Sequence, residues 1–395
     1  MSRQVIHIIG ISDDPSQELS GEAMDLIAGG RVFSGGKRHH ELVARLLPED
    51  SEWIEIRVPL NDVFTEYSLH PAIIVFASGD PLFYGFASTV MREMPDAEVH
   101  VYPYFNSLQM LAHRLLLPYQ DMRSVSLTGR LWKGLDTALI QGEKLIGVLT
   151  DRSKTPDSIA RRMLQYGYDN YEVSVGESLG NGISERVRTM TLADTVGMNF
   201  RYPNCVILRQ TSSRQIPFGI PDSSFALLEG RTRMITKMPV RLAVLSMLDL
   251  GSRNSFWDIG FCTGSVSIEA KLRFPHLDIT AFEKRPQGME LMTANSIRFG
   301  TPGITAVEGD FMELSLDSYP RPDAVFIGGH GGLLAEMIGV IDKVLMPGGV
   351  IVFNSVSEQS QALFAEGVSA VGRKITGCIR VAVDDHNPIE IMKAE

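Results

Sequence analysis

Four apolar stretches in the last third of the chain end in glycines or acidic residues, and these ends carry the residues best suited to chemistry. The stretch Ser255 to Ile259 runs into the turn Gly260-Phe261-Cys262-Thr263-Gly264, which a helical stretch, 266–272, follows. The next stretches, 277–282, 304–307 and 323–327, end in Glu283, Glu308-Gly309-Asp310 and Gly328-Gly329. Glycines let a backbone approach a ligand, and acids at successive strand ends can bind its hydroxyl groups. The pattern predicts a cofactor pocket.

The spacing of these residues favours S-adenosylmethionine (SAM) over a nicotinamide dinucleotide. A dinucleotide fingerprint reads Gly-x-Gly-x-x-Gly, whereas here Asp258 precedes Gly260 and Gly264. An acid in that place suits the free ammonium group of the methionine moiety. Glu283, about 20 residues past the turn, can accept both ribose hydroxyls, and Asp310 can reach the adenine amino group. A dehydrogenase remains the main alternative for this half.

A second loop of this kind follows the apolar stretch 72–76. It reads Ser78-Gly79-Asp80-Pro81-Leu82-Phe83-Tyr84-Gly85. A loop with Gly, Asp and Pro at a strand end can offer backbone groups to an adenosine or methionine moiety. Gly-Asp-Pro is also an ordinary turn, so this second site depends on its context.

The elements that must position these loops alternate between strand and helix along the whole chain, which is the α/β pattern. Helices are expected at 41–47, 86–94 and 156–166, the last with Thr155 as N-cap. The other expected strands are 5–9, 31–33, 53–58, 98–102, 124–127, 144–149, 172–175, 204–208, 350–354, 374–383 and 389–392. The last two suggest an antiparallel pair.

The stretch 212–222 is polar, interrupted by Pro and Gly, and without periodicity, so it is the predicted linker. It would separate a two-lobed α/β domain, 1–211 with lobes of about 1–120 and 121–211, from a Rossmann-like domain, 223–395. The length of 395 residues fits two to three domains.

Composition narrows the class of protein. The net charge of −10 argues against a broad nucleic-acid surface, and no apolar run reaches the ~18 residues of a membrane span. The three cysteines are widely spaced, and neither they nor the adjacent His39 and His40 suggest a metal site. With no signal-peptide pattern at the start, a cytoplasmic enzyme is expected.

The C-terminal half resembles the decarboxylating methyltransferases of cobalamin biosynthesis, which methylate a precorrin at carbon 15 and remove carbon dioxide from the ring C acetate. The resemblance covers roughly residues 219–357 and rests on Thr236-Lys237, Arg241, the run 257–265, Glu269-Ala270, Glu283 and 326–329. Two departures are Pro239, where a glutamate is common, and Cys262, where the family has a glycine.

The N-terminal half, over most of residues 4–210, resembles the tetrapyrrole methylase family and its branch that methylates precorrin carbon 5. The matching segments are Gly10, 35–39, 78–85, 106–109, 127–130, 150–156 and 175–180. The order of the halves resembles fused enzymes that methylate carbons 5 and 15 and decarboxylate, with or without cobalt in the ring. One SAM per domain is implied. The predicted SAM contacts are Thr236, Asp258, Gly260, Phe261, Cys262, Thr263, Gly264, Glu283, Gly309, Asp310, Phe311, Gly328, Gly10, Gly79, Asp80, Pro81 and Ser107.

The implied tetrapyrrole carries many carboxylates, for which Arg and Lys are the natural partners. Arg241 and His330 are weaker candidates for a catalytic role, since His330 could bind a substrate carboxylate or guide a proton. The predicted substrate contacts are Lys37, Arg38, Arg130, Arg231, Arg233 and Lys237. For any one of them, a solvated surface charge is the competing interpretation.

Two other functions stay open at this point. One is a tandem SAM methyltransferase that acts on RNA or protein, with one half possibly inactive. The other is a non-catalytic binding module with one degenerate pocket. No nucleic-acid or membrane partner is expected, and a homo-oligomer, a dimer or tetramer, is expected because such assemblies are common in both half-families.

Overall fold

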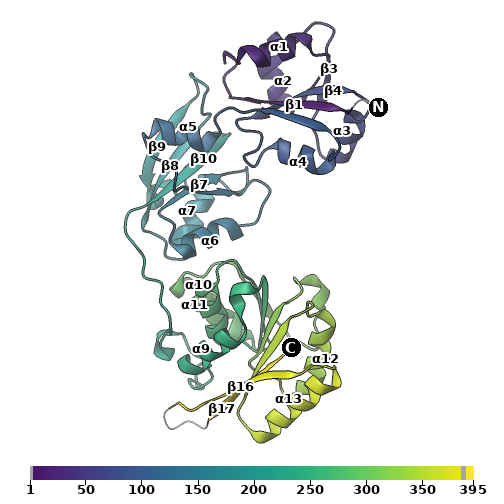
Figure 1. Cartoon of the computed structure of the whole chain (residues 1–395). Helices are drawn as coiled ribbons and strands as arrows, with labels where there is room; N and C mark the ends of the chain where they lie inside the picture. Colours follow the sequence, from purple (N-terminus) through teal and green to yellow (C-terminus); the bar gives the residue numbers. More distant parts are fainter. Residues whose placement is uncertain (1–2, 384–387) are drawn as a thin grey trace. The chain divides into compact units, whose positions relative to one another are not determined.

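The computed structural model describes residues 3–383 and 388–395 and divides into two compact units (Figure 1). The first unit comprises Met1–Arg130, Lys144–Arg161 and Tyr171–Thr211. The second comprises Leu131–Glu143, Arg162–Asn170 and Ser212–Glu395. In the described part of the chain, no helix is long and apolar enough to cross a membrane.

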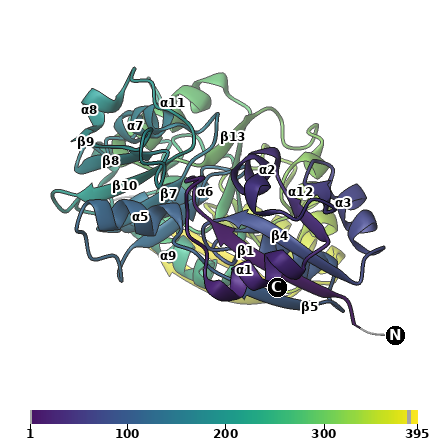
Figure 2. The ribbon, with the colours of Figure 1, turned by 90° about the horizontal axis from the view of Figure 1, so that it is seen from above.

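The first unit begins with a parallel five-stranded sheet in the order β3-β2-β4-β1-β5, whose strands β4, β1 and β5 run side by side in Figure 2. Helices α1 and α2 cover one face, and α3 and α4 cover the other. The elements are β1 (Val5–Ile11), α1 (Gly21–Gly29), β2 (Val32–Gly35), α2 (Lys37–Val43), β3 (Glu52–Glu55), α3 (Leu60–Tyr67), β4 (Ala72–Ser78), α4 (Phe86–Glu93) and β5 (Glu98–Tyr102).

A second, mixed sheet follows in the order β6-β7-β10-β8-β9, in which only β6 and β7 pair in parallel. Helix α5 packs its apolar side chains against β10. The elements are α5 (Ser107–Arg114), β6 (Arg123–Ser126), α6 (Lys133–Gln141), β7 (Leu145–Leu149), α7 (Pro156–Gln165), β8 (Tyr171–Glu177), β9 (Arg186–Thr191), α8 (Leu192–Thr195) and β10 (Asn204–Gln210).

The sheet of the second unit has seven strands in the order β13-β12-β11-β14-β15-β17-β16, with β17 antiparallel to both of its neighbours. Apolar residues of α12 and α13 pack on one face, and those of α9 and α10 on the other. The elements are α9 (Met238–Met247), β11 (Ser255–Ile259), α10 (Ser265–Arg273), β12 (Asp278–Glu283), α11 (Pro286–Phe299), β13 (Ile304–Glu308), β14 (Ala324–Ile327), α12 (Leu334–Val344), β15 (Val350–Ser355), α13 (Glu358–Ala370), β16 (Ile375–Val381) and β17 (Ile389–Ala394).

Local sequence explains these elements well in the second unit. Every residue of β11 is buried, because helices cover both faces of a parallel sheet. Helix α11 begins with Pro286 in its first turn, where the missing N–H costs nothing, and ends at Gly300 in the left-handed conformation. The strand order turns back between β11 and β14, and ligands of such sheets bind at that point, beyond the carboxyl ends of the strands.

The predicted α/β architecture and the antiparallel final pair are confirmed. Strand β9 was not predicted, and some bounds of the predicted elements were wrong. The helix expected at 41–47 begins earlier, at Lys37, and the strand expected at 53–58 ends at Glu55. Residues 212–221 contain no helix or strand, and the linker and domain boundaries stay predictions.

Candidate active sites

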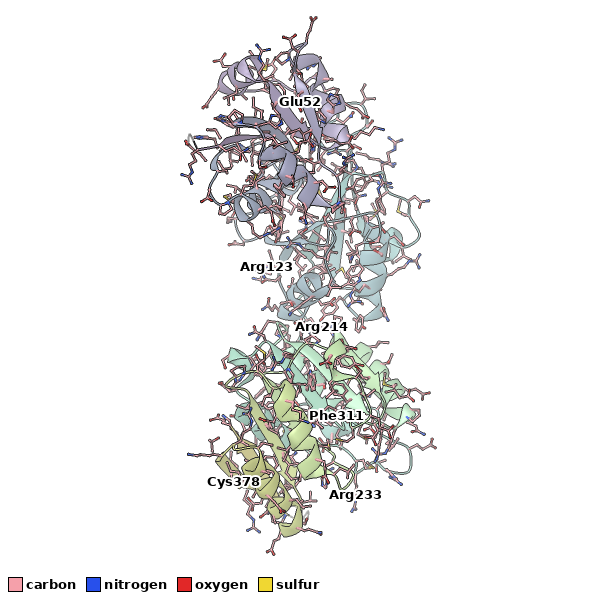
Figure 3. All side chains as sticks on the ribbon, turned by 90° about the vertical axis from the view of Figure 1, so that its right-hand side faces the viewer. Glu52, Arg123, Arg214, Arg233, Phe311 and Cys378 are labelled. Atoms are coloured by element: carbon pink, nitrogen blue, oxygen red, sulfur yellow. The ribbon has the colours of Figure 1, made fainter. Side chains whose placement is uncertain are left out.

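A pocket of about 690 Å³ lies at the carboxyl ends of β11, β12, β13 and β14. Its volume falls within the ~300–1,000 Å³ typical of small-molecule sites. The predicted site residues that line it are Thr236, Gly260, Phe261, Cys262, Glu283, Gly309, Asp310, Phe311, Gly328, Arg233, Lys237 and His330. Figure 3 labels Phe311 within this unit and Arg233 at its surface.

The turn after β11 is built for close approach of backbone to backbone. A Cβ on Gly260 would lie 2.8 Å from the Gly329 nitrogen, and Gly260 has a φ of +78°. Only glycine fits there without displacing the neighbouring loop. Cys262 also has a positive φ, +50°, a backbone conformation that residues other than glycine rarely adopt. Its Sγ contacts the Met234 carbonyl oxygen at 3.2 Å.

Glu283 is held in place before any ligand binds. Its Oε2 accepts a hydrogen bond from the Cys262 N–H at 3.0 Å. Its Oε1 accepts one from the Arg285 N–H at 3.0 Å, and the Arg285 guanidinium lies 3.2 Å away. The residue is 3% exposed and lines the pocket, so a carboxylate is fixed where hydroxyl groups of a ligand can donate to it.

The next strand end supplies a second acid and an aromatic wall. Asp310 is exposed, and its Oδ1 accepts the Met312 N–H at 3.1 Å, which fixes the turn after β13. Phe311 is buried, with its ring edge-on to that of Phe282 at a centroid distance of 5.3 Å. An aromatic ring beside an acid suits a flat, amino-bearing base such as adenine.

The rim of this pocket is more basic than the sequence analysis predicted. Lys284 and Arg285 line it together with Arg233 and Lys237. Both missed residues directly follow Glu283, so the run Glu-Lys-Arg at a strand end was the available signal. The pocket also includes Asn354, whose buried amide oxygen has no hydrogen-bond partner among the residues the structure describes. Nothing in its surrounding sequence singled it out.

His330 lies in the loop after β14 and lines the pocket. Its Nδ1 accepts the Gly332 N–H at 3.1 Å, which leaves Nε2 to carry the proton of the neutral ring. Partial burial lowers its pKa from the usual value. The side chain is therefore a neutral hydrogen-bond donor at neutral pH.

Four of the SAM or substrate residues predicted for the C-terminal half are not among those that line the pocket: Asp258, Thr263, Gly264 and Arg231. The direct contact expected between Asp258 and the methionine ammonium needs correction. Asp258 is 1% exposed, and its Oδ2 accepts from the Ser267 hydroxyl at 2.6 Å and the Ser267 N–H at 3.2 Å. Burial raises its pKa to about 7, against the hydrogen bonds from Ser267. Gly264 instead is the N-cap of α10, with a φ of +73°.

Arg241 is also corrected, because it is fully buried and committed to other groups. It is ion-paired with the equally buried Glu269 and lies 3.3 Å from Asp222. It donates to the Thr236 carbonyl at 2.6 Å and the Ile220 carbonyl at 2.5 Å. Four of its five N–H donors are taken and the side chain is fully buried, so the structure gives it a part in fixing the segment that leads into the pocket wall.

Two of the predicted N-terminal site residues, Gly10 and Gly79, meet at the carboxyl edge of the first sheet. A Cβ on Gly10 would lie 2.0 Å from the Gly79 carbonyl oxygen, so β1 passes directly against the loop after β4. The Gly79 N–H donates to the Ile11 carbonyl at 2.8 Å, and its own carbonyl accepts from the Tyr104 N–H at 3.2 Å. Asp80 fixes the same loop by accepting the Leu82 N–H at 2.9 Å.

Arg130, from the second lobe, reaches the same loop. Its guanidinium lies over the Tyr84 ring, 5.1 Å from the centroid, and the Tyr84 hydroxyl donates to the Ser124 carbonyl at 3.0 Å. Tyr84 has a positive φ of +53°, so the loop holds an unusual backbone conformation where the lobes meet. Pro81 is buried, and Ser107 begins α5 behind its N-cap, Asn106. Lys37 is exposed at the start of α2.

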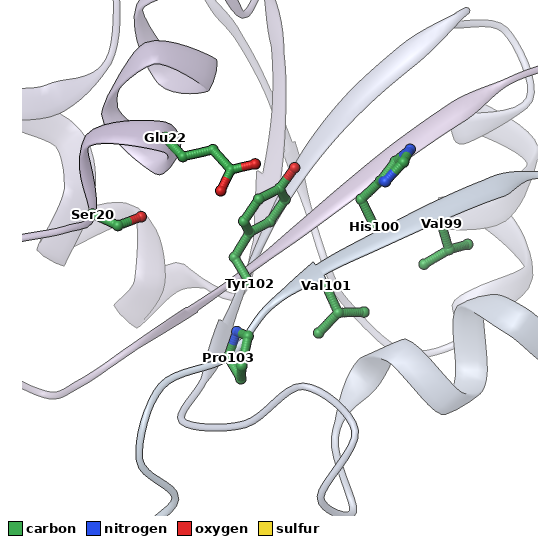
Figure 4. A pocket seen from close by; sticks show the side chains of 7 residues that line it. All are labelled: Ser20, Glu22, Val99, His100, Val101, Tyr102 and Pro103. Carbon is green, nitrogen blue, oxygen red and sulfur yellow. The ribbon is translucent and has the colours of Figure 1, made fainter.

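A separate hollow lies beside β5 and is shown in Figure 4. Its lining includes Glu22, His100 and Tyr102 but none of the predicted site residues. No group of three or more potential metal ligands occurs in residues 3–383 and 388–395.

Two family models match the chain. Residues 5–195 match Tetrapyrrole (Corrin/Porphyrin) Methylases, and residues 230–394 match the Precorrin methyltransferase domain. A Precorrin-6Y C(5,15)-methyltransferase (decarboxylating) from a Sinorhizobium species is 32% identical over 388 residues, 97% of this chain and 91% of that protein.

Shorter relatives match part of the chain. A Cobalt-precorrin-6B C(15)-methyltransferase (decarboxylating) from Salmonella typhimurium is 33% identical over 162 residues, 41% of this chain and 83% of that protein. A crystal structure of a precorrin-6y C5,15-methyltransferase from Geobacter metallireducens, at 37% identity and a TM-score of 0.42, covers 46% of this chain and 99% of that one.

Proposed function

The chain belongs to the precorrin-6Y C5,15-methyltransferases (decarboxylating), SAM-dependent enzymes of cobalamin biosynthesis, and from this premise we propose how its two units divide the reaction. The N-terminal unit methylates carbon 5. The C-terminal unit methylates carbon 15 and removes carbon dioxide from the C12 acetate, which gives precorrin-8X. A relative named for the C15 reaction alone, aligned over only 41% of this chain, supports one half being sufficient for that step.

The C-terminal pocket is the observation that carries this proposal. It combines a glycine turn that leaves no room for a side chain at Gly260, a fixed carboxylate at Glu283, and an acid beside an aromatic ring at Asp310 and Phe311. We propose that Glu283 accepts the ribose hydroxyls and that Asp310 and Phe311 hold the adenine. SAM, when bound, supplies an already activated methyl group, so the protein's task is to position the acceptor carbon and exclude water.

The positively charged residues at the rim of this pocket suit the second ligand, the tetrapyrrole. Arg233, Lys237, Lys284 and Arg285 line one pocket of a chain whose net charge is −10. We propose that they bind the peripheral carboxylates of the tetrapyrrole, because guanidinium and ammonium groups form charge-assisted hydrogen bonds with carboxylates.

During decarboxylation the bond between the methylene and carboxyl carbons breaks, carbon dioxide leaves, and the electron pair enters the conjugated ring. A proton taken up from solvent then converts the methylene into a methyl group. The rim would then hold the other carboxylates while the departing one stays free. We propose that His330 donates its Nε2–H to the tetrapyrrole. It does not act as a base, because Nδ1 already accepts the Gly332 N–H.

The N-terminal unit is proposed to hold a second SAM at the loops of Gly10 and Gly79, with substrate contacts from Arg38 and Arg130. A homo-oligomeric state and a cytoplasmic location remain predictions.

The proposal is tested by mass spectrometry of the product formed from precorrin-6Y and isotope-labelled SAM. Two added methyl groups and one lost carbon dioxide are expected. Calorimetric titration with SAM should give two sites per chain. A single methylation by the intact chain, or one SAM site, would contradict two active units.

A further inference from the structure

Three polar side chains meet where β4 ends and the Gly79-Asp80-Pro81 loop begins. The His39 Nε2 lies 2.9 Å from the Ser78 Oγ, and the Arg38 Nη2 donates to the same oxygen at 3.1 Å. Arg38 is one of the predicted substrate contacts, whereas His39 belongs to the matching segment 35–39 without a predicted role. Within residues 3–383 and 388–395, His39 belongs to no cluster of potential metal ligands.

The direction of each hydrogen bond follows from the state of the histidine. The Gly36 N–H donates to the His39 Nδ1 at 3.3 Å, so the proton of the neutral ring is on Nε2. Burial, with a smaller effect from Arg38, lowers the pKa of His39 to about 4, so the ring is neutral at physiological pH. His39 and Arg38 are therefore both donors to Ser78.

A hydroxyl oxygen has two acceptor positions and one proton. Since both neighbours donate to the Ser78 Oγ, its own proton must point to a third group. Among the described residues, no acceptor takes that proton. Ser78 is exposed, so its O–H is a donor directed outward at the edge where Gly10 and Gly79 meet.

The cluster is anchored from several segments. Arg38 is also paired with Asp13 of the loop after β1, with Nη1 and Oδ1 3.4 Å apart. The Asp13 carbonyl in turn accepts from the Asn181 side chain at 3.4 Å, and that residue follows β8 in the second lobe. The Arg38 side chain remains 40% exposed, so some of its N–H groups can reach a ligand beside Ser78.

We propose that the Ser78 hydroxyl and the Arg38 guanidinium form a carboxylate-binding subsite of the N-terminal site, and that His39 is a positioning residue that orients the Ser78 hydroxyl. The Ser78 O–H and an N–H of the Arg38 guanidinium lie side by side, so each can donate to one of the two oxygens of a carboxylate. The carboxylate is either a side chain of the tetrapyrrole or the α-carboxylate of SAM. The inference rests on the proposed carbon-5 role of this unit.

The first test is steady-state kinetics of the full chain, with carbon-5 methylation followed by mass spectrometry. Ser78→Ala should raise the KM of one ligand about tenfold or more, since a hydrogen bond to a charged group is lost. A higher KM for precorrin-6Y would show that the subsite binds a carboxylate of the tetrapyrrole. A higher KM for SAM would show that it binds the α-carboxylate of SAM. Ser78→Thr, which keeps the hydroxyl, should restore most of the affinity. Unchanged KM values for both ligands in Ser78→Ala would overturn the subsite.

The positioning role of His39 needs its own control. His39→Phe should reproduce the KM change of Ser78→Ala, and the double variant should show no further loss, because both changes remove one oriented donor. The neighbouring His40 stacks on Trp53 and is outside the cluster, so His40→Phe should leave both KM values unchanged. Additive effects of the two changes at 39 and 78 would contradict the orientation of Ser78 by His39.

Carbon-15 methylation and thermal unfolding of each variant report whether the chain is folded. If the unaltered chain fails to methylate carbon 5 at all, the proposed function of the unit fails. If the unaltered chain methylates carbon 5 and Ser78→Ala leaves both KM values unchanged, only the subsite fails.

Discussion

At the scale of single residues, His330 is the side chain whose chemistry the structure narrows most. Its neutral ring presents a fixed Nε2–H. His330→Ala should lower the rate of carbon-15 methylation about tenfold or more while His330→Gln, which retains an N–H donor, should lose less. Carbon-5 methylation by the same chain serves as the reference. Equal rates for His330→Ala and the unaltered chain would remove this residue from the site.

The buried carboxyl group of Asp258 should make the free energy of unfolding depend on pH. Burial raises its pKa to about 7, whereas an unfolded aspartate titrates near ~3.9. Between these values the folded chain holds a proton that the unfolded chain has lost. The free energy of unfolding should therefore fall as the pH rises through this range, by up to roughly 1.4 kcal/mol per pH unit from this group.

Asp258→Asn should remove that contribution, because the amide stays neutral. In urea unfolding, the stability of the variant relative to the unaltered chain should increase from about pH 5 to about pH 8. A constant difference across that range would show that Asp258 does not titrate as the structure indicates.

Substitutions at Cys262 test whether this residue has the left-handed backbone conformation. Cys262→Val should lower the free energy of unfolding by about 1–2 kcal/mol, since a β-branched residue is disfavoured at positive φ. Cys262→Gly should not show this loss, and it retains the backbone N–H that Glu283 accepts. Equal unfolding free energies for the two variants, measured with denaturant, would contradict the assigned conformation.

At the scale of elements, Arg241 and Glu269 join α9 to α10. Removing one partner leaves a buried charge uncompensated, so Arg241→Met should destabilise the chain by about 3–5 kcal/mol. Adding Glu269→Gln should recover part of that loss. A variant with a normal melting temperature but a raised KM for the tetrapyrrole would contradict this structural role and place Arg241 in the active site.

This pair also shows why the sequence could not give the whole site. The apolar runs and their terminal glycines and acids were sufficient to predict Gly260, Glu283 and Asp310. Arg241 was a candidate for a catalytic role, because its buried partner Glu269 lies 28 positions away in the chain and the sequence does not show that the two pair. Strand β9 was missed, since its side chains are mostly polar and half-exposed and give no apolar run.

At the scale of the whole molecule, the first unit carries two sheets and the second carries one, and each unit has its own candidate site. The C-terminal pocket draws all its lining residues from one unit. The Gly10 and Gly79 contact and the Ser78 cluster lie entirely within the other. A change confined to one pocket should therefore leave the chemistry of the other unit intact.

Mass spectrometry of the product from Glu283→Ala is the most direct test of this separation. With precorrin-6Y and labelled SAM, we predict a product with one added methyl group, at carbon 5, and no loss of carbon dioxide. The assignment of carbon-15 chemistry to this pocket would be contradicted by one result. That result is a Glu283→Ala variant that adds both methyl groups and removes carbon dioxide at the rate of the unaltered chain.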